Sequence, residues 1–334
     1  MTMTSLRQRQ SGSIPLLIHL CLFLALGSVN AMAQTNWPNR PVRVVITSPA
    51  GGTVDLLARI LSESFTKTFG QPFVVEARAG ANGTIGVGSV VNAPADGHSL
   101  FVTTPGPFST NMHLHAKLPF DARTDLAPIS MLAYSPLLVV VHPSVPAKTW
   151  PELAAWLKER PGKVNYSSLG VGTTSHLGIE LLKRASGVDM LHVPYKGSTA
   201  GFADLLSGEV QVTLNTTSAI LPFLKKGQLR AIAGSEKRRS SWLPDVPTLD
   251  ESGVPGFDVM SWFGLGTRSG VPREIINRLA LESVNTMKRA DVVKLLAPIG
   301  LEIWLLGPEP FADYIRTEVD KWGDIIRRVG IKPE

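Results

Sequence analysis

The sequence predicts an α/β protein of two domains, each built on a parallel β-sheet covered by helices. Short apolar segments alternate with amphipathic segments along most of the chain, which is typical of parallel strands connected by helices. The 334 residues also exceed what one hydrophobic core usually organises. With 44% apolar and 18% charged residues, the composition is globular and excludes a disordered, collagenous or coiled-coil protein.

Residues 1–33 have the layout of a secretory signal peptide. Arg7 and Arg9 precede an apolar stretch at 14–26, and Ala31-Met32-Ala33 follows as a cleavage signal. We therefore expect cleavage after Ala33 and a periplasmic, soluble mature protein. An uncleaved anchor is the alternative, but the stretch is shorter than the roughly 20 residues that span a bilayer.

The only cysteine, Cys21, lies inside this segment. The residues before it, Ile18-His19-Leu20, lack the small side chain that usually precedes a lipid-modified cysteine. The mature chain therefore offers no disulfide, thiol nucleophile or Cys-ligated metal. An exported protein without disulfides fits a bacterial periplasm.

The strands and helices are predicted from hydrophobic periodicity. Short apolar segments bounded by Gly, Ser and Thr predict strands at Val42–Thr47, Phe73–Glu76, Leu100–Thr104, Leu137–Val141, Val164–Ser167, Leu191–Pro194, Val210–Leu214, Leu229–Ala233 and Asp258–Leu265. Amphipathic spacing predicts helices at Val54–Phe69, from Gly86 to Val91, and at Trp150–Arg160, His176–Ala185, Phe202–Leu206, Ile220–Lys226, Pro272–Met287, Asp291–Ala297 and Glu309–Val329. Gly70 and Gly227 are placed to end two of these helices.

Polar loops follow the predicted strands in both halves of the chain. Gly51-Gly52-Thr53 joins a strand to a helix, and a Ser/Thr/Gly loop at 168–175 does the same further on. In parallel sheets, ligands bind at the carboxyl ends of the strands. Two sets of helix N-termini facing one cleft would bind an anion through backbone N–H groups.

Several chemistries are excluded by their missing motifs. There is no Gly-x-x-x-x-Gly-Lys-Ser/Thr phosphate loop, and the Gly-x-Gly-x-x-Gly spacing of a dinucleotide turn is absent from the first turn. The formal charge is +6 for the whole chain and, after removal of Arg7 and Arg9, +4. This mild excess is too dispersed for a nucleic-acid-binding surface.

No constellation predicts catalysis or a metal site. Ser168 lacks the Gly-x-Ser-x-Gly elbow of a hydrolase, and His113 and His115 have no third ligand nearby. His176 begins a helix after a Ser/Thr loop, where capping, site-lining and structural roles all remain open. We expect His192 to be a buried residue or to lie at a sheet edge. We expect a binding protein without a cofactor or metal, not an enzyme.

Six ordered motifs carry a family resemblance. They are Trp37-Pro38-Asn39-Arg40-Pro41-Val42-Arg43, Pro49-Ala50-Gly51-Gly52-Thr53-Val54-Asp55, Ala93-Pro94-Ala95-Asp96-Gly97-His98-Ser99-Leu100, His192-Val193-Pro194-Tyr195-Lys196-Gly197-Ser198, Leu243-Pro244-Asp245-Val246-Pro247-Thr248 and Ser261-Trp262-Phe263-Gly264. Across nearly the whole mature chain, the sequence resembles the Bug family, the solute receptors of tripartite tricarboxylate transporters.

The resemblance implies a type II periplasmic binding protein, with two α/β domains joined by two crossover segments around a ligand cleft. The first domain would comprise residues 34–135 and 259–334, and the second residues 136–258. Such a receptor binds a small organic acid, closes by hinge motion and delivers the acid to membrane permease subunits. We expect a monomer without nucleic-acid partners.

The resemblance also implies which residues bind the carboxylate, through backbone N–H groups, hydroxyls and bridging waters. In the first domain they are Ala50, Gly51, Gly52, Thr53, Asp55, Ala81, Asn82, Pro105, Gly106 and Phe108. In the second domain they are Ser168, Gly170, Gly172, Thr173, Thr174, His176, Lys196, Gly197, Ser198, Asn215 and Thr216.

Two positions depart from the family pattern. The first turn usually reads Pro-Ala-Gly-Gly-Gly-Thr-Asp, whereas Thr53 and Val54 stand here for the last Gly and the Thr. The strand that often ends in Asp ends here in Asn215. We hypothesise that this loss of charge disfavours a ligand with an ammonium group and favours a plain carboxylic acid. A sensor subunit of a two-component system is the alternative function, and an enzyme on the same scaffold is a third.

Overall fold

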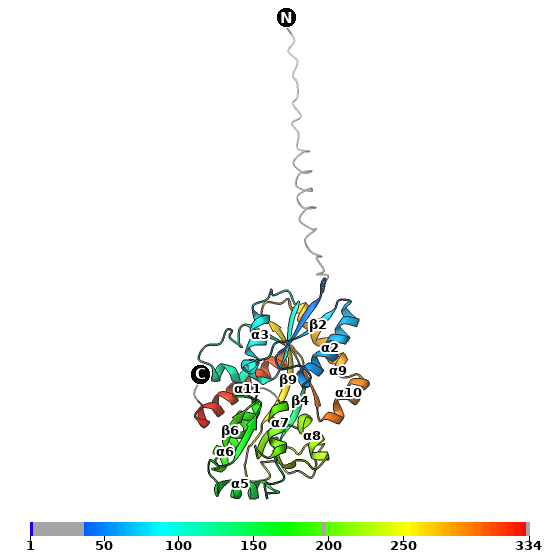
Figure 1. The fold of residues 1–334 in the computed structure, drawn as a ribbon. Coiled ribbons are helices and arrows are strands. Elements are labelled where there is room, and N and C mark those ends of the chain that lie inside the picture. Colours follow the sequence, from blue (N-terminus) through cyan, green and yellow to red (C-terminus); the bar gives the residue numbers. More distant parts are fainter. Residues whose placement is uncertain (3–36, 196–197, 332–334) are drawn as a thin grey trace.

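The computed structural model describes residues 1–2, 37–195 and 198–331 of the chain (Figure 1). The predicted signal segment with Cys21 lies almost entirely outside these residues, as do Lys196 and Gly197. Figure 1 shows two lobes, one carrying α2, α3 and α9 and the other carrying α5, α6 and α7. Strands β4 and β9 lie between them.

The long strand β4 (Leu126–Val141) belongs to both lobes. Its first part, residues 126–136, pairs with β9 (Met260–Arg268), and residues 137–141 pair with β7 (Val212–Thr216). The strand order is therefore β2-β1-β3-β9-β4-β7-β5-β6. Strands β10 (Glu302–Leu306) and β8 (Arg230–Gly234) also pair with β4, one in each lobe.

The predicted parallel pairs are present in both lobes. In the upper lobe of Figure 1, β1 (Val42–Ile46) runs parallel to β2 (Phe73–Ala77) and to β3 (Ser99–Thr103). In the lower lobe, β5 (Asn165–Ser168) runs parallel to β6 (Leu191–Pro194) and to β7. The alternation of elements did not predict the antiparallel pairs of β4 with β7, β8, β9 and β10, nor that of β3 with β9. These arise because β4 and β9 traverse the molecule in opposite directions.

Helices cover the sheet on both faces. They are α2 (Thr53–Phe69), α3 (Thr84–Val91), α4 (Asn111–Leu114), α5 (Trp150–Lys158), α6 (Thr174–Ser186), α7 (Ser198–Ser207), α8 (Thr217–Lys225), α9 (Arg273–Met287), α10 (Ala290–Leu296) and α11 (Pro308–Val329). Single helical turns span Ala81–Gly83 (η2), Gly106–Thr110 (η3) and Ala297–Ile299 (η4). None of the helices in the described part of the chain is long and apolar enough to cross a membrane.

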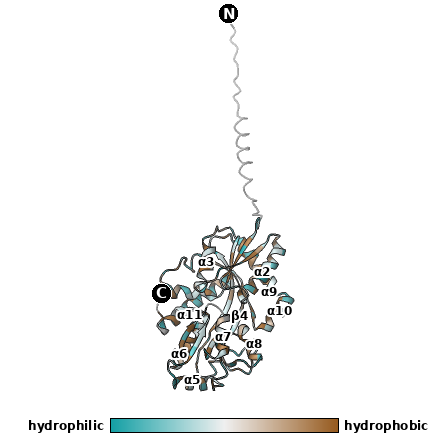
Figure 2. Cartoon of the chain, viewed as in Figure 1, coloured by the Kyte–Doolittle hydropathy of each residue, from teal (hydrophilic) through white to brown (hydrophobic). Residues whose placement is uncertain are grey.

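Helix α2 shows how the sequence pattern becomes structure. Leu57, Leu61 and Phe65 lie on one face and are fully buried against the sheet, as their spacing predicted. Gly70 ends the helix in the left-handed region, with φ 74°, and its N–H donates to the Thr66 carbonyl. In Figure 2 the strands are predominantly apolar, whereas teal segments lie on the outer helices.

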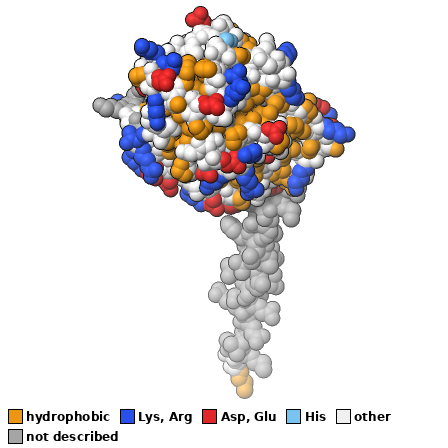
Figure 3. All heavy atoms as spheres, turned by 90° about the horizontal axis from the view of Figure 1, so that it is seen from below, with side chains coloured by type: hydrophobic (Ala, Val, Ile, Leu, Met, Phe, Trp, Pro, Cys, Tyr) orange, Lys and Arg blue, Asp and Glu red, His pale blue; other side chains and the backbone are white. Residues whose placement is uncertain are grey.

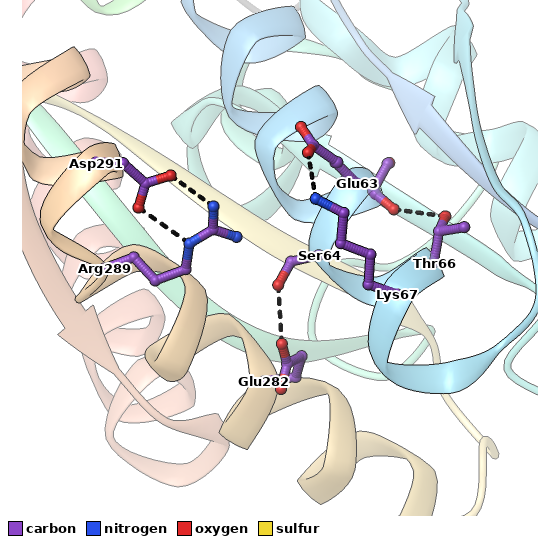
Figure 4. Close-up of polar contacts among 8 residues, drawn as sticks. Glu63, Ser64, Thr66, Lys67, Glu282, Arg289 and Asp291 are labelled. Carbon is purple, nitrogen blue, oxygen red and sulfur yellow. Dashed lines mark hydrogen bonds and ion pairs between the residues drawn. The ribbon is translucent and has the colours of Figure 1, made fainter.

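Polar contacts between α2 and α9 supplement this apolar packing (Figure 4). The hydroxyls of Ser64 and Thr68 both donate to Glu282 Oε1, each at 2.9 Å. The neighbouring pairs Lys67–Glu63 and Arg289–Asp291 lie at the surface. Exposed ion pairs of this kind add at most about 1 kcal/mol each, so the buried apolar face holds α2 in place.

The surface carries charges of both signs. Seen from below, the molecule shows Lys and Arg side chains interspersed with Asp and Glu and with hydrophobic side chains (Figure 3). On this face the arrangement agrees with the dispersed charge of the sequence.

Helix α11 extends from one lobe to the other. Near its start, Phe311 packs edge-to-face against Phe108 and Trp262 of the upper lobe. Near its end, Trp322 and Ile326 join the hydrophobic cluster that contains α5, α6 and the second half of β4. Between them, the buried Glu318 accepts hydrogen bonds from Trp262 Nε1 at 3.2 Å and from Trp322 Nε1 at 3.0 Å.

Replacing Glu318 by leucine is expected to destabilise the protein strongly. Glu318→Leu would leave two buried indole N–H groups without an acceptor, and each costs about 1–3 kcal/mol. We expect the free energy of unfolding, measured by urea titration, to fall by about 2–5 kcal/mol. The exposed Glu309, which pairs with Arg273, provides the control Glu309→Leu, with an expected change below about 0.5 kcal/mol. Equal effects of the two substitutions would contradict this assignment.

Candidate functional site

Three of the predicted loops follow strands directly and begin helices. Residues 50–52 precede α2, residues 169–173 precede α6, and Asn215-Thr216 ends β7 before α8. Thr173 caps α6 by accepting from the His176 N–H. No side chain caps α2 at Gly52 or α8 at Thr216. The N-termini of α2 and α8 therefore present uncapped backbone donors of the kind that bind carboxylates.

Asp55 stabilises the first loop by accepting a hydrogen bond from its backbone. Gly51 adopts φ +85°, and its N–H donates to Asp55 Oδ2 at 2.9 Å. Burial opposes ionisation of Asp55, but the Gly51 N–H and the Arg59 guanidinium hold its pKa below the usual value. Ala50, Gly51 and Gly52 are exposed and Thr53 is half-buried. The loop is therefore accessible, while its only acid is already paired.

The second loop of this lobe holds Asn82 in a fixed orientation. Ala81 and Asn82 have φ values of 45° and 46°, in the left-handed region that Asn tolerates. Asn82 Nδ2 donates to Oδ1 of the fully buried Asn111 at 2.8 Å, and Asn111 Nδ2 returns a bond to the Asn82 carbonyl. A Cβ on Gly106 would lie 2.6 Å from that carbonyl, so this approach requires glycine.

The two lobes meet at Gly172. Its carbonyl accepts from Asn82 Nδ2 at 3.0 Å and from Thr110 Oγ1 at 3.3 Å, both of the upper lobe. Its N–H donates to His176 Nδ1 at 3.2 Å, within its own lobe. Predicted residues from the two halves of the chain, Asn82 and Gly172, are thus brought into direct contact.

A stacked aromatic cluster lies beneath the loop at 168–173. The His192 ring stacks on Tyr166 at 4.9 Å between centroids and on His176 at 4.1 Å. His192 Nε2 lies 2.6 Å from Ser168 Oγ, which also accepts from the Gly170 N–H. Burial and the neighbouring His176 lower the pKa of His192 to about 4, and burial lowers that of His176. Both rings are therefore neutral near pH 7.

His192 was not predicted as part of this loop's support. The available sequence signal was the place of His192 in the predicted strand Leu191–Pro194. In the structure this strand, β6, pairs in parallel with β5, and His192 lies opposite Tyr166. Sequence alone did not reveal that this register places the imidazole beside Ser168. Thr173 Oγ1 bonds the Gly170 carbonyl at 2.7 Å, and Thr174 begins α6 half-buried. Side chains of its own lobe thus hold this loop, in addition to the bonds that Gly172 accepts from Asn82 and Thr110 of the other lobe.

The remaining predicted residues are dispersed around this contact. Asn215 is buried, and its Oδ1 accepts from the Thr216 N–H at 2.8 Å. Ser198 begins α7, and Lys196 and Gly197 lie outside the described residues. Pro105 and Gly106 are buried at η3. The Phe108 ring lies in the aromatic cluster with Phe101, Trp262 and Phe311, so only its backbone could face a ligand.

A cavity of about 380 Å³ lies elsewhere, between α11 and the start of β4. Phe108 is the only predicted site residue that lines it, along with residues such as Leu126, Ile315 and Arg316. In the described residues, no group of three His, Cys, Asp or Glu side chains could hold a metal ion. His113 Nε2 instead bonds the Val319 carbonyl of α11 at 2.9 Å.

Two α/β lobes that share long strands and meet through strand-end loops define a bilobal solute-binding protein. Residues 57–331 match the tripartite tricarboxylate transporter family receptor, and the chain belongs to this family of periplasmic solute-binding proteins. It is 31% identical over 319 residues to protein BugT of Bordetella pertussis, covering 95% of this chain and 98% of that one. It is 32% identical to a protein encoded between tcbD and tcbE in Pseudomonas sp. strain P51, with 94% of each chain covered.

Solved structures show the same fold. Rpa4515 of Rhodopseudomonas palustris, solved with adipate, has a TM-score of 0.84 and 33% identity, covering 89% of this chain and 100% of that one. MatC from the same organism, solved with bound malate, has a TM-score of 0.78 and 30% identity, covering 87% and 100%. BugD, a periplasmic binding protein, has a TM-score of 0.82 and 30% identity, covering 89% and 100%. The predicted family and fold are confirmed.

The neutral histidine stack predicts acid sensitivity of the fold. The His192 pKa of about 4 lies below the ordinary value of 6.5, so between these values the unfolded chain binds more protons. The free energy of unfolding should therefore rise with pH across this window. His192→Gln, which keeps an acceptor for Ser168, should reduce the slope, leaving the part due to His176. Chemical denaturation at several pH values measures it.

The control for this measurement is His142→Gln, because His142 lies in the bend after β4 and outside the stack. It should leave the slope of the wild-type protein unchanged. An unchanged slope in His192→Gln would contradict the assignment of the acid sensitivity to this ring.

Proposed function

We propose that this receptor captures a small organic acid between its two lobes and delivers it to the permease of a tripartite tricarboxylate transporter. The observation that carries the proposal is the meeting of strand-end loops from both lobes at the Asn82–Gly172 contact. Family membership and the carboxylates named in two related structures, adipate and malate, support the ligand class.

The proposed binding surface consists of backbone donors and hydroxyls from both lobes. The uncapped N-termini of α2 and α8 each supply positive electrostatic potential to a carboxylate. In the upper lobe the surface comprises Ala50, Gly51, Gly52, Thr53, Asp55, Ala81, Asn82, Pro105, Gly106 and the Phe108 backbone. In the lower lobe it comprises Ser168, Gly170, Gly172, Thr173, Thr174, His176, Lys196, Gly197, Ser198, Asn215 and Thr216.

We further propose a role without catalysis. The Ser168–His192 pair has the short distance of a nucleophile and base, 2.6 Å. However, a His192 pKa of about 4 makes the imidazole a weak base near neutral pH, and Ser168 is 2% exposed. The pair therefore supports the loop. The protein would act as a periplasmic monomer after cleavage at Ala33, with domains of 34–135 plus 259–334 and of 136–258.

A carboxylate ligand is expected to raise the melting temperature of the purified protein. A ligand at 100 times its Kd adds about 2.7 kcal/mol, which corresponds to a rise of roughly 4 °C for a protein of this size. A thermal-shift screen would compare mono-, di- and tricarboxylates, aromatic acids and amino acids. The protein is first unfolded and refolded to remove any co-purified ligand. If none of these acids raised the melting temperature, the proposal would be contradicted.

Asn215→Asp tests whether the end of β7 faces the carboxylate. The new carboxylate can still accept the Thr216 N–H that Asn215 accepts now. It would repel an anionic ligand. At an effective dielectric of 20, two like charges about 7 Å apart repel each other by about 2 kcal/mol. We expect the Kd of the acid found in the screen to rise at least about tenfold by calorimetry.

Asn165→Asp supplies the matched control, because Asn165 lies at the opposite end of the same sheet and bonds the Glu209 carbonyl. It adds the same charge away from the proposed surface, so the Kd should change less than about twofold. Asn215→Asp would refute the assignment if it bound the acid as tightly as this control.

A further inference from the structure

Gly172 is the residue through which the two lobes are hydrogen-bonded in the loop region. Both backbone groups of Gly172 are engaged, since its N–H donates to His176 Nδ1 and its carbonyl accepts from Asn82 and Thr110. The bond to His176 lies within the lower lobe, and the other two cross to the upper lobe. The two adjacent peptide groups that meet at the Gly172 Cα therefore connect an imidazole to the interdomain contact.

Both sides of this contact are held in advance. Asn82 is oriented by Asn111, whose Nδ2 also donates to Thr84 Oγ1 at 2.9 Å. Gly172 has φ +77°, and a Cβ there would lie 2.5 Å from Leu114 Cδ1 of the upper lobe. The positive φ favours glycine here, and a larger residue would also require the Leu114 side chain to move. The donors and the acceptor thus meet without a change in either loop.

We propose that the backbone of Gly172 is an interdomain clasp that favours the closed arrangement of the lobes, and that His176 is the positioning residue that holds it. Asn82 and Thr110 of the other lobe donate the hydrogen bonds that hold the clasp. This inference concerns the equilibrium between open and closed receptor, and it goes beyond the proposed ligand and transporter.

The clasp has a chemical consequence for pH. His176 accepts at Nδ1, and a protonated imidazole has no acceptor nitrogen. Protonation of His176 would therefore break the bond to the Gly172 N–H, release the loop and favour opening.

The groups around the His176 ring decide how readily it protonates. On α6 these are Glu180, which favours the proton, and Lys183, which opposes it. On β6 the neutral His192 stacks against it, with Tyr166 of β5 behind. Burial outweighs Glu180 and keeps the pKa of His176 below its usual value. The clasp is thus intact near neutral pH and weakens only at a pH below the ordinary range of histidine.

The test measures the distance between the lobes without any ligand. The only cysteine in the chain, Cys21, lies in the predicted signal segment, so the chain from residue 34 provides a cysteine-free background for spin labels at Ile85→Cys on α3 and Arg184→Cys on α6. Both positions are exposed and lie one in each lobe. Pulsed dipolar spectroscopy should show a short-distance population at pH 7.5. Asn82→Ala should shift it toward longer distances, with the closed-to-open ratio falling between about two- and tenfold.

Asn92→Ala is the matched control, because Asn92 ends α3 in an exposed position away from Gly172. It should leave the distance distribution unchanged. Unfolding midpoints of both variants show whether the fold is kept. If Asn82→Ala gave the same distribution as Asn92→Ala, or if the ligand-free wild-type protein showed only the long distance, the clasp would be refuted.

His176→Asn separates a positioning role from a merely structural one. The Asn Oδ1 occupies the place of Nδ1 and still accepts from Gly172, but it does not titrate. At pH 7.5 this variant should retain the short distance, and on acidification it should not show the opening that the wild-type protein shows. His176→Leu should be open at both pH values. A His176→Asn variant that opened with acid like the wild-type protein would overturn the role of His176.

This measurement is independent of the proposed function. If no organic acid binds, the distances still report on the clasp. If the clasp fails, binding of an acid in the thermal-shift screen still supports the receptor.

Discussion

The continuity of β4 is the constraint on which the structure depends. A single strand of 16 residues supplies backbone pairing to both lobes, and it changes partners from β9 to β7 near Pro136. Its second half alternates between two hydrophobic clusters, with Val139 and Val141 on one face and Leu138 and Val140 on the other. Both lobes are thereby built on one covalent axis. We expect any relative motion of the lobes to be a bend where the partners change.

The surroundings of this point are polar. Thr217 Oγ1 donates to the Pro136 carbonyl at 3.0 Å, and Ser235 bonds the backbone of Val259 beside it. Helix α11 connects the lobes a second time through Phe311 and Trp322, with Glu318 between them. A few directional hydrogen bonds at a strand crossing can rearrange at low cost, whereas the two apolar ends of α11 resist separation. We therefore expect that any opening would be a bend at the crossing and not a separation of the lobes.

Most of the fold was predictable because periodicity reports burial on one face. The helices at 53–69 and 273–287 and the strand at 191–194 match their predicted ranges closely. The first half of β4 was not predicted, because prolines such as Pro128 and Pro136 are unfavourable in a central strand. In the structure a register shift accommodates Pro128, and β4 changes its pairing partner at Pro136. Strand β10 was missed because its five residues are all half-buried and do not alternate. At the site, Asn82 and Gly172 were predicted, but their mutual bond depends on tertiary approach, as does the contact of Ser168 with His192.

The same contacts explain how a receptor with a largely backbone-built site could respond to its ligand. A clasp of two neutral hydrogen bonds to one carbonyl contributes about 1–3 kcal/mol. That is comparable to the differences that separate open from closed populations in two-state proteins. A ligand therefore needs only a modest preference for the closed arrangement to dominate the equilibrium. With a much stronger clasp, the ligand-free receptor would remain closed. Without a clasp, the ligand alone would have to supply the whole free energy of closure. In the proposed clasp, one glycine carbonyl between the two lobes would keep this equilibrium in the range that the proposed small-acid ligand can shift.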